Sequence, residues 1–132
     1  MTLTEAFAAA GFTLRNPRCD WSAMSDDGKK VALTVWSDEI NKSRAPWSYG
    51  DIAAQKLAIW QNRAGNSVRK RHLRHVRNHC DGRAELVLVT AQDVTAEPRK
   101  VERARPWPER TGVLQEFDET TGEFRMDLIP TR

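Results

Sequence analysis

The stretch SVRKRHLRHVRNHC, from Ser67 to Cys80, decides how the rest of the chain is organised. On a helix with about 100° per residue, the apolar side chains of this stretch share one broad side: Val68, Leu73, Val76 and Cys80. The cations lie on the opposite side: Lys70, Arg71, Arg74 and Arg77. Like charges four residues apart on a helix repel by a few tenths of a kcal/mol. A helix that tolerates this repulsion packs firmly through its other side or meets an anion.

The residues on either side of this helix predict its neighbours. Asn66 or Ser67 is a candidate N-cap, and Asp81-Gly82 places a glycine where a helix commonly ends. The run AELVLVT (84–90) is almost unbroken in its apolar character, which is typical of a central strand covered on both faces. Before the basic helix, Asp51 is a good N-cap for another helix that ends near Gln61.

The two ends of the chain carry short helix and hairpin signals. Thr4 and Gly11 are suitable as the N-cap and the stop of a helix over 4–10. Alternating apolar residues and turn residues predict a hairpin at each end and a further strand between them. The predicted strands are 21–24 and 30–36 in the first hairpin, 98–104, and 113–117 and 123–128 in the second. Ser37 to Gly50, with Pro46, is expected to be an irregular loop.

This order of elements predicts an α+β fold. Hairpins at both ends argue against a doubly wound parallel sheet. We expect a single globular domain over residues 1–132, because one core usually serves about 100–200 residues. Its sheet should be mixed and mostly antiparallel, or an open barrel, with two to three helices packed on one side.

Composition indicates a soluble protein of the cytoplasm. The chain has 30% charged residues and no apolar run near the ~18 residues that a membrane span needs. The N-terminal residues lack the pattern of a signal peptide, so Cys19 and Cys80 are expected to be free thiols. The net charge of +3 says little, whereas the absence of any acid from Arg63 to Arg77 marks a local basic surface.

The basic helix is a candidate surface for nucleic acid. Lysine and arginine neutralise phosphates and release counterions, so the binding they provide weakens steeply with salt. The expected phosphate-binding residues are Lys70, Arg71, Arg74 and Arg77. An ordinary solvated helix face is the alternative, since basic faces are common.

Aromatic residues near the first hairpin are candidates for base recognition. The chain contains five tryptophans, and flat rings stack on unpaired bases with about 1–3 kcal/mol each. Trp36, Trp47 and Tyr49 are the stacking candidates, and Asp38 and Glu39 are candidates for contacting a base edge. Simple core packing is the alternative for each ring, and for Trp21 and Trp36 in particular.

Metal binding and catalysis have weaker signals. His72, His75 and His79 share an edge of the basic helix, and histidines at this spacing can bind Zn²⁺ when other elements complete the site. No HExxH or paired CxxC motif completes it, so we expect no metal and no cofactor and assign no catalytic residue. A metal-assisted nuclease would have to use acids without a diagnostic spacing, together with Lys30: Asp20, Asp38, Glu39 and Glu85.

Three segments resemble a known kind of domain: VALTVWSDEI (31–40), NSVRKRHLRHV (66–76) and AELVLVTAQDVTAEPRKV (84–101). They are similar to a small bacterial domain that occurs alone or ahead of HNH nuclease modules in restriction-type proteins. The resemblance covers roughly residues 16–130 and implies a DNA-reading module related to PUA- or EVE-like readers of modified bases. The matching positions are Trp36 with Asp38, and Arg71-His72-Leu73. The chain lacks an HNH module, so the resemblance does not imply cleavage.

The leading hypothesis is a non-catalytic nucleic-acid-binding module, with DNA expected before RNA and a flipped or modified base as a possible target. The alternatives are a metal-assisted nuclease and a protein-interaction module that meets an acidic partner. The sequence leaves the oligomeric state open.

Overall fold

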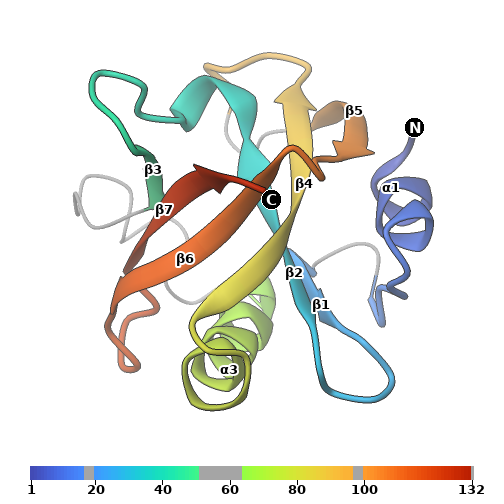
Figure 1. Ribbon diagram of the computed structural model, residues 1–132. Coiled ribbons are helices and arrows are strands. Elements are labelled where there is room, and N and C mark those ends of the chain that lie inside the picture. The colour runs from blue at the N-terminus through green and yellow to red at the C-terminus, as the bar shows by residue number, and fades with distance from the viewer. Residues whose placement is uncertain (17–19, 51–63, 97–99, 132) are drawn as a thin grey trace.

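The computed structural model describes residues 1–16, 20–50, 64–96 and 100–131. Within these ranges the chain forms two α-helices, one short 3-10 helix and seven strands (Figure 1). In chain order they are α1 (Leu3–Ala9), β1 (Ser22–Met24), β2 (Val31–Trp36), η1 (Ser37–Glu39), β3 (Trp47–Gly50), α3 (Ala64–His79), β4 (Arg83–Ala91), β5 (Val101–Pro106), β6 (Arg110–Phe117) and β7 (Phe124–Pro130).

All seven strands belong to one sheet, which curls into a half-barrel. The strand order is β1-β2-β4-β6-β7-β3, and β5 pairs with β4 beside that path. Only β2 and β4 run parallel among these strands, because the connection that contains α3 carries the chain back across the sheet. The remaining pairs are antiparallel. The predicted α+β class, with a mixed and mostly antiparallel sheet, is confirmed.

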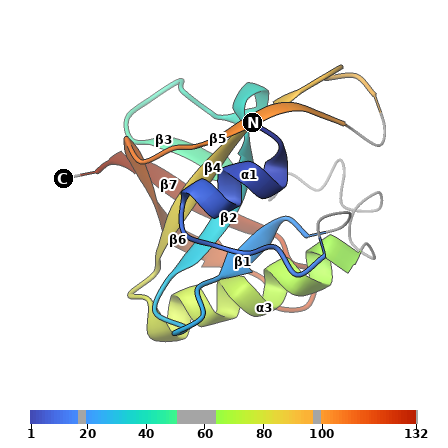
Figure 2. The same cartoon turned by 90° about the vertical axis from the view of Figure 1, so that its right-hand side faces the viewer.

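Alternation along the strands divides the core into two clusters. Val31, Leu33 and Val35 of β2 point into the barrel, where Leu73 and Val76 of α3 meet them. The intervening Ala32 points outward and is covered by Phe7 of α1. Helix α1 thus covers the outward-pointing residues over β4 and β5, whereas α3 packs on the inward-pointing residues beside β1 and β2; Figure 2 shows α1 in front of the strands and α3 below them.

Helix boundaries differ from the sequence-based expectation at two N-termini. Helix α1 is capped by Thr2, not Thr4, because the Thr2 hydroxyl accepts from the Glu5 amide while the Glu5 carboxylate accepts from the Thr2 amide. Asn66 and Ser67 lie inside α3 and do not cap it. The expected stops are confirmed, since Gly11 and Gly82 adopt φ of +93° and +74° after their helices.

The expectation of an irregular loop over 37–50 is wrong in part. Its first residues form η1, and its last four form β3, which pairs antiparallel with β7. The edge of the C-terminal hairpin supplies the pairing partner, which no local pattern in 37–50 indicates. The helix expected over 51–61 lies outside the described residues. No described helix is long and apolar enough to cross a membrane.

Candidate functional site

Helix α3 lies across one end of the half-barrel, between the turns of two hairpins (Figures 1 and 2). Its fully buried side chains are Asn66, Leu73 and Val76, and Arg69 is only 5% exposed. These four residues follow the helical spacing of three and four. Val68, expected on the buried side, is only half-buried, so the helix faces the core with a more polar side than predicted.

One flank of α3 is bonded to the β1–β2 hairpin. We call it the histidine flank, and it consists of His72, His75, His79 and Cys80. His72 Nδ1 lies 2.6 Å from the hydroxyl of Ser22, which is 1% exposed. His75 Nε2 hydrogen-bonds the Gly28 carbonyl, and the Cys80 thiol donates to the Lys29 carbonyl at 3.5 Å. The ring of His79 stacks on that of His75 at 4.8 Å.

Burial sets the charge state of this flank. Burial first, and the neighbouring charge of Arg71 second, lower the pKa of His72 from 6.5 to about 4. His72 is therefore neutral near pH 7. Burial also raises the pKa of the Cys80 thiol, which keeps it protonated. His72 and Cys80 consequently bond the hairpin as neutral groups.

The opposite flank carries the predicted phosphate-binding residues. We call it the cationic flank: Lys70, Arg71, Arg74 and Arg77. Arg74 Nε and Arg77 Nη2 each donate to Oε1 of Glu119 at 2.8 Å, and Lys70 Nζ donates to the Thr120 carbonyl at 3.3 Å. Glu119 and Thr120 belong to the β6–β7 turn. This turn supplies the acid that the helix sequence lacks, and it offsets the repulsion between the cations.

The cationic flank remains open to solvent in spite of these bonds. The side chains of Arg74 and Arg77 are 48% and 45% exposed, and that of Glu119 is 44% exposed. Hydrogen bonds from Arg74 and Arg77 lower the pKa of the Glu119 carboxyl, so it is ionised at neutral pH. Two arginines share this one carboxylate, so the group of three keeps a positive balance.

The β6–β7 turn is attached to α3 by a separate set of contacts. Asn66 Nδ2 donates to the Thr121 carbonyl at 3.0 Å. Gly122 has φ of +89°, and a Cβ at this position would meet the Asn66 carboxamide. Asp118 Oδ1 accepts from the amides of Thr120 and Thr121 and closes the turn. The position of the turn therefore does not depend on the Glu119 side chain.

Arg69 is a buried cation that the sequence-based reasoning missed. Its guanidinium lies 4.8 Å from the ring centres of both Trp21 and Phe124. Cation–π contacts of this kind are stronger when they are removed from water. The signal was its spacing of three or four residues from Asn66 and Leu73, which places it among buried positions. Arg69 therefore closes the end of the barrel and is not part of the exposed cationic flank.

The aromatic candidates occupy different places in the fold. Trp36 ends β2 and Trp47 begins β3, whereas Tyr49 lies further along β3 in the core cluster that also contains Leu73 of α3. Tyr49 is 5% exposed, packs against Phe124 and receives a hydrogen bond from the Trp36 amide. Its ring offers no open face for a base.

Trp47 is half-buried between two cations. Lys42 Nζ lies 4.7 Å from its ring centre, and the guanidinium carbon of Arg110 lies 3.9 Å from it. Asp38 and Glu39, the candidates for a base edge, lie in η1. Asp38 and Glu39 therefore stay beside Trp36 at the end of β2, whereas the cationic flank bonds the β6–β7 turn.

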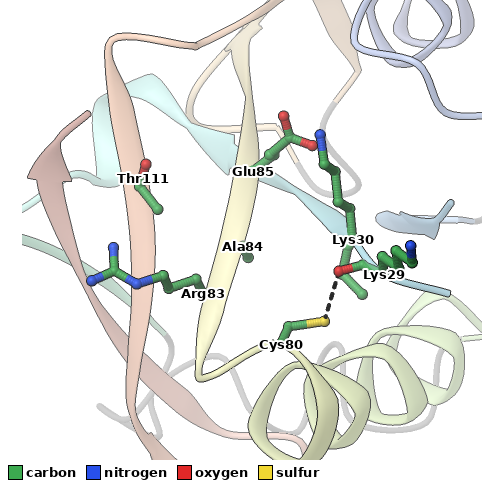
Figure 3. A pocket seen from close by; sticks show the side chains of 8 residues that line it. Lys29, Lys30, Cys80, Arg83, Ala84, Glu85 and Thr111 are labelled. Atoms are coloured by element: carbon green, nitrogen blue, oxygen red, sulfur yellow. Dashed lines mark hydrogen bonds between the residues drawn. The ribbon is translucent and has the colours of Figure 1, made fainter. Parts of the chain in front are cut away.

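The acids considered for a nuclease are dispersed. Asp20 is buried and accepts from the Asn16 amide, whereas Asp38 and Glu39 follow the far end of β2. Lys30 and Glu85 both line a pocket of about 210 Å³ beside the C-terminal end of α3, where their side chains point toward one another (Figure 3). Among the described residues, no three His, Cys, Asp or Glu side chains are placed to hold a metal ion.

No protein-family model, curated protein or solved structure matches this chain. The geometry described above is therefore the basis for any functional conclusion.

Proposed function

We propose that this protein is a nucleic-acid-binding module that holds phosphates on the cationic flank of α3. The observation that carries the proposal is the pair Arg74 and Arg77, which share one carboxylate and stay nearly half exposed on a helix that also carries Lys70 and the exposed Arg71. Guanidinium groups suit phosphate oxygens because their planar N–H groups donate in pairs. The described bonds use one N–H group of Arg74 and two of Arg77, so further donors remain for a ligand.

The proposed contact is with the phosphodiester backbone. Trp36 and Trp47 are at the far end of the sheet, so a base stacked on either ring would need a second contact point along a longer strand. The resemblance of 31–40, 66–76 and 84–101 to DNA-reading domains favours DNA over RNA. The absence of a signal-peptide pattern favours a cytoplasmic setting with reduced thiols. No catalytic step is part of the proposal.

Binding measured against salt concentration tests the proposal. Labelled 16-base-pair DNA, its single strands and the matching RNA are titrated with the protein while fluorescence anisotropy is recorded. We expect binding at low salt, with log Kobs falling linearly with log salt. The double variant Lys70→Ala/Arg74→Ala should weaken binding about tenfold or more and reduce the slope on duplex DNA by about two.

Arg105→Ala is the matched control. Arg105 is an exposed arginine on β5 that pairs with Glu109 at 3.2 Å, away from α3. Combined with Arg103→Ala at another exposed arginine of β5, its removal changes the net charge by the same amount as the double helix variant and should leave the salt slope unchanged. Absence of binding at low salt, or equal slopes in the wild type and the double variant, would refute the proposal.

An acidic protein partner is a second candidate function. The bond of Glu119 to Arg74 and Arg77 demonstrates that a carboxylate fits these side chains as well. Polyglutamate added at the same charge concentration distinguishes the two. Competition as strong as that of unlabelled DNA would favour the acidic partner.

A further inference from the structure

The guanidinium groups of Arg74 and Arg77 converge on one oxygen atom. Arg74 Nε and Arg77 Nη2 both donate to Glu119 Oε1, each at 2.8 Å. The two arginines are three residues apart on α3 and therefore neighbours on its surface. Short bonds from two cations to a single oxyanion form a site that fits one negatively charged oxygen.

A phosphate oxygen has the same requirements as this carboxylate oxygen. Both accept charge-assisted hydrogen bonds from guanidinium groups, with similar lengths and directions. We infer that Arg74 and Arg77 form a seat for one phosphodiester oxyanion, and that Glu119 occupies this seat in the free protein as an internal competitor. This inference rests on the proposed function and adds to it the residue that limits affinity.

The fold permits Glu119 to leave the seat. Its side chain is 44% exposed, on a turn that reaches the solvent. Asn66, Gly122 and Asp118 hold the turn by contacts that do not involve the Glu119 carboxylate. A phosphate can therefore displace the carboxylate while the β6–β7 hairpin stays against α3.

Replacement of the Glu119 carboxylate by a phosphate should change how the binding constant depends on salt concentration. Two arginines already partly neutralised by Glu119 attract fewer counterions, so phosphate binding releases fewer of them. Removing the competing charge should steepen the slope of log Kobs against log salt by about 0.9 on duplex DNA. It should also tighten binding at low salt by about two- to tenfold, the effect of losing an exposed ion pair that competes with the ligand.

The variant Glu119→Gln tests the inference, with Glu116→Gln as its matched control. Glu116 lies on the same hairpin but pairs with Arg125 of β7 at 3.4 Å, so both variants gain the same net charge. Affinity and salt slope on the 16-base-pair duplex are compared with the wild type. We expect tighter binding and a steeper slope for Glu119→Gln alone. Equal behaviour of the two variants, or weaker binding by Glu119→Gln, would overturn the inference.

Inorganic phosphate separates this inference from the proposed function. The Nε–H resonances of Arg74 and Arg77 are followed by NMR while phosphate is added. We expect them to shift at lower phosphate concentration in Glu119→Gln than in the wild type. If no nucleic acid binds yet this difference is seen, the proposed function fails and the seat stands. If phosphate leaves the resonances unmoved in both proteins, the seat is refuted.

Discussion

The two flanks of α3 use polar side chains in opposite ways. On the histidine flank, His72 is bonded to a serine that is 1% exposed, and burial keeps its ring neutral. On the cationic flank, Arg74 and Arg77 keep nearly half of their side-chain surface in water while they bond Glu119. The buried contact is costly to break, because its groups would be left without solvent. The exposed contact can exchange for another anion, because water and salt compensate its loss.

This difference teaches that residue type alone does not mark a binding surface. Arg69 and Arg77 lie on the same helix, eight residues apart, and have the same charge. Arg69 is 5% exposed between two aromatic rings, whereas the side chain of Arg77 is 45% exposed. We therefore expect the first to determine stability and the second to determine affinity.

The largest expected effect is a difference in stability between variants of these two arginines. Arg69→Ala removes a buried side chain from Trp21 and Phe124 and should lower the free energy of unfolding by about 2–4 kcal/mol. Arg77→Ala should lower it by less than about 1 kcal/mol. Urea denaturation followed by tryptophan fluorescence measures both. Similar losses in the two variants would remove the distinction between the buried arginine and the exposed one.

The next largest effect is the stability loss of a variant that disturbs the contact between the β6–β7 turn and α3. Gly122→Ala places a Cβ against the Asn66 carboxamide at a φ of +89°, and we expect a loss of about 2–3 kcal/mol. Gly11→Ala is the control, since Gly11 has φ of +93° with no atom near its Cβ position. That variant should lose only the backbone penalty of about 1–2 kcal/mol. Equal losses would mean that the turn is not packed on Asn66 as described.

A smaller effect should appear in the pH dependence of stability. His72 has a folded pKa of about 4 against an ordinary value of 6.5, so between these values the unfolded chain binds more protons. Above pH 6.5 this group adds no pH dependence, and stability should fall as pH drops from about 6.5 toward 4. Discounted for partial exposure of the ring, the loss is about 1–2 kcal/mol.

The groups around His72 define the control for this measurement. Arg71, His75 and Arg15 act against its protonation, and Asp20 favours it. The variant His72→Gln keeps these neighbours and removes the titrating ring. Chemical denaturation at several pH values should give a flatter profile for the variant. Parallel profiles for the two proteins would show that His72 does not remain neutral in the folded state.

The smallest expected effect concerns the thiol at the end of the histidine flank. The raised pKa of Cys80 and its bond to the Lys29 carbonyl should slow its alkylation a few-fold at pH 8 relative to the unfolded chain. Mass spectrometry of the Cys19→Ser variant, with and without urea, measures this rate at Cys80 alone. Equal rates in both conditions would place the thiol outside the contact with Lys29.

Much of the local structure was predictable from residue patterns. The basic helix, its glycine stop, the strand over 84–90 and both terminal hairpins follow from apolar periodicity and turn residues, which act over a few positions. The cations of 70–77 were also recognised, and three of them, Lys70, Arg74 and Arg77, bond the β6–β7 turn. Strand β3 was missed because its pairing partner, β7, lies far away in the sequence.

The amino-acid sequence by itself determined that a helix near 67–80 would carry cations and no acid. Only the tertiary structure decided what each side of that helix does. Arg74 meets Glu119 across 45 residues, His72 meets Ser22 across 50, and Asn66 meets Thr121 across 55. Helical periodicity is a short-range property, whereas these contacts depend on how the sheet curls and brings two hairpin turns to opposite flanks of α3. Burial on one flank and exposure on the other follow from that curl.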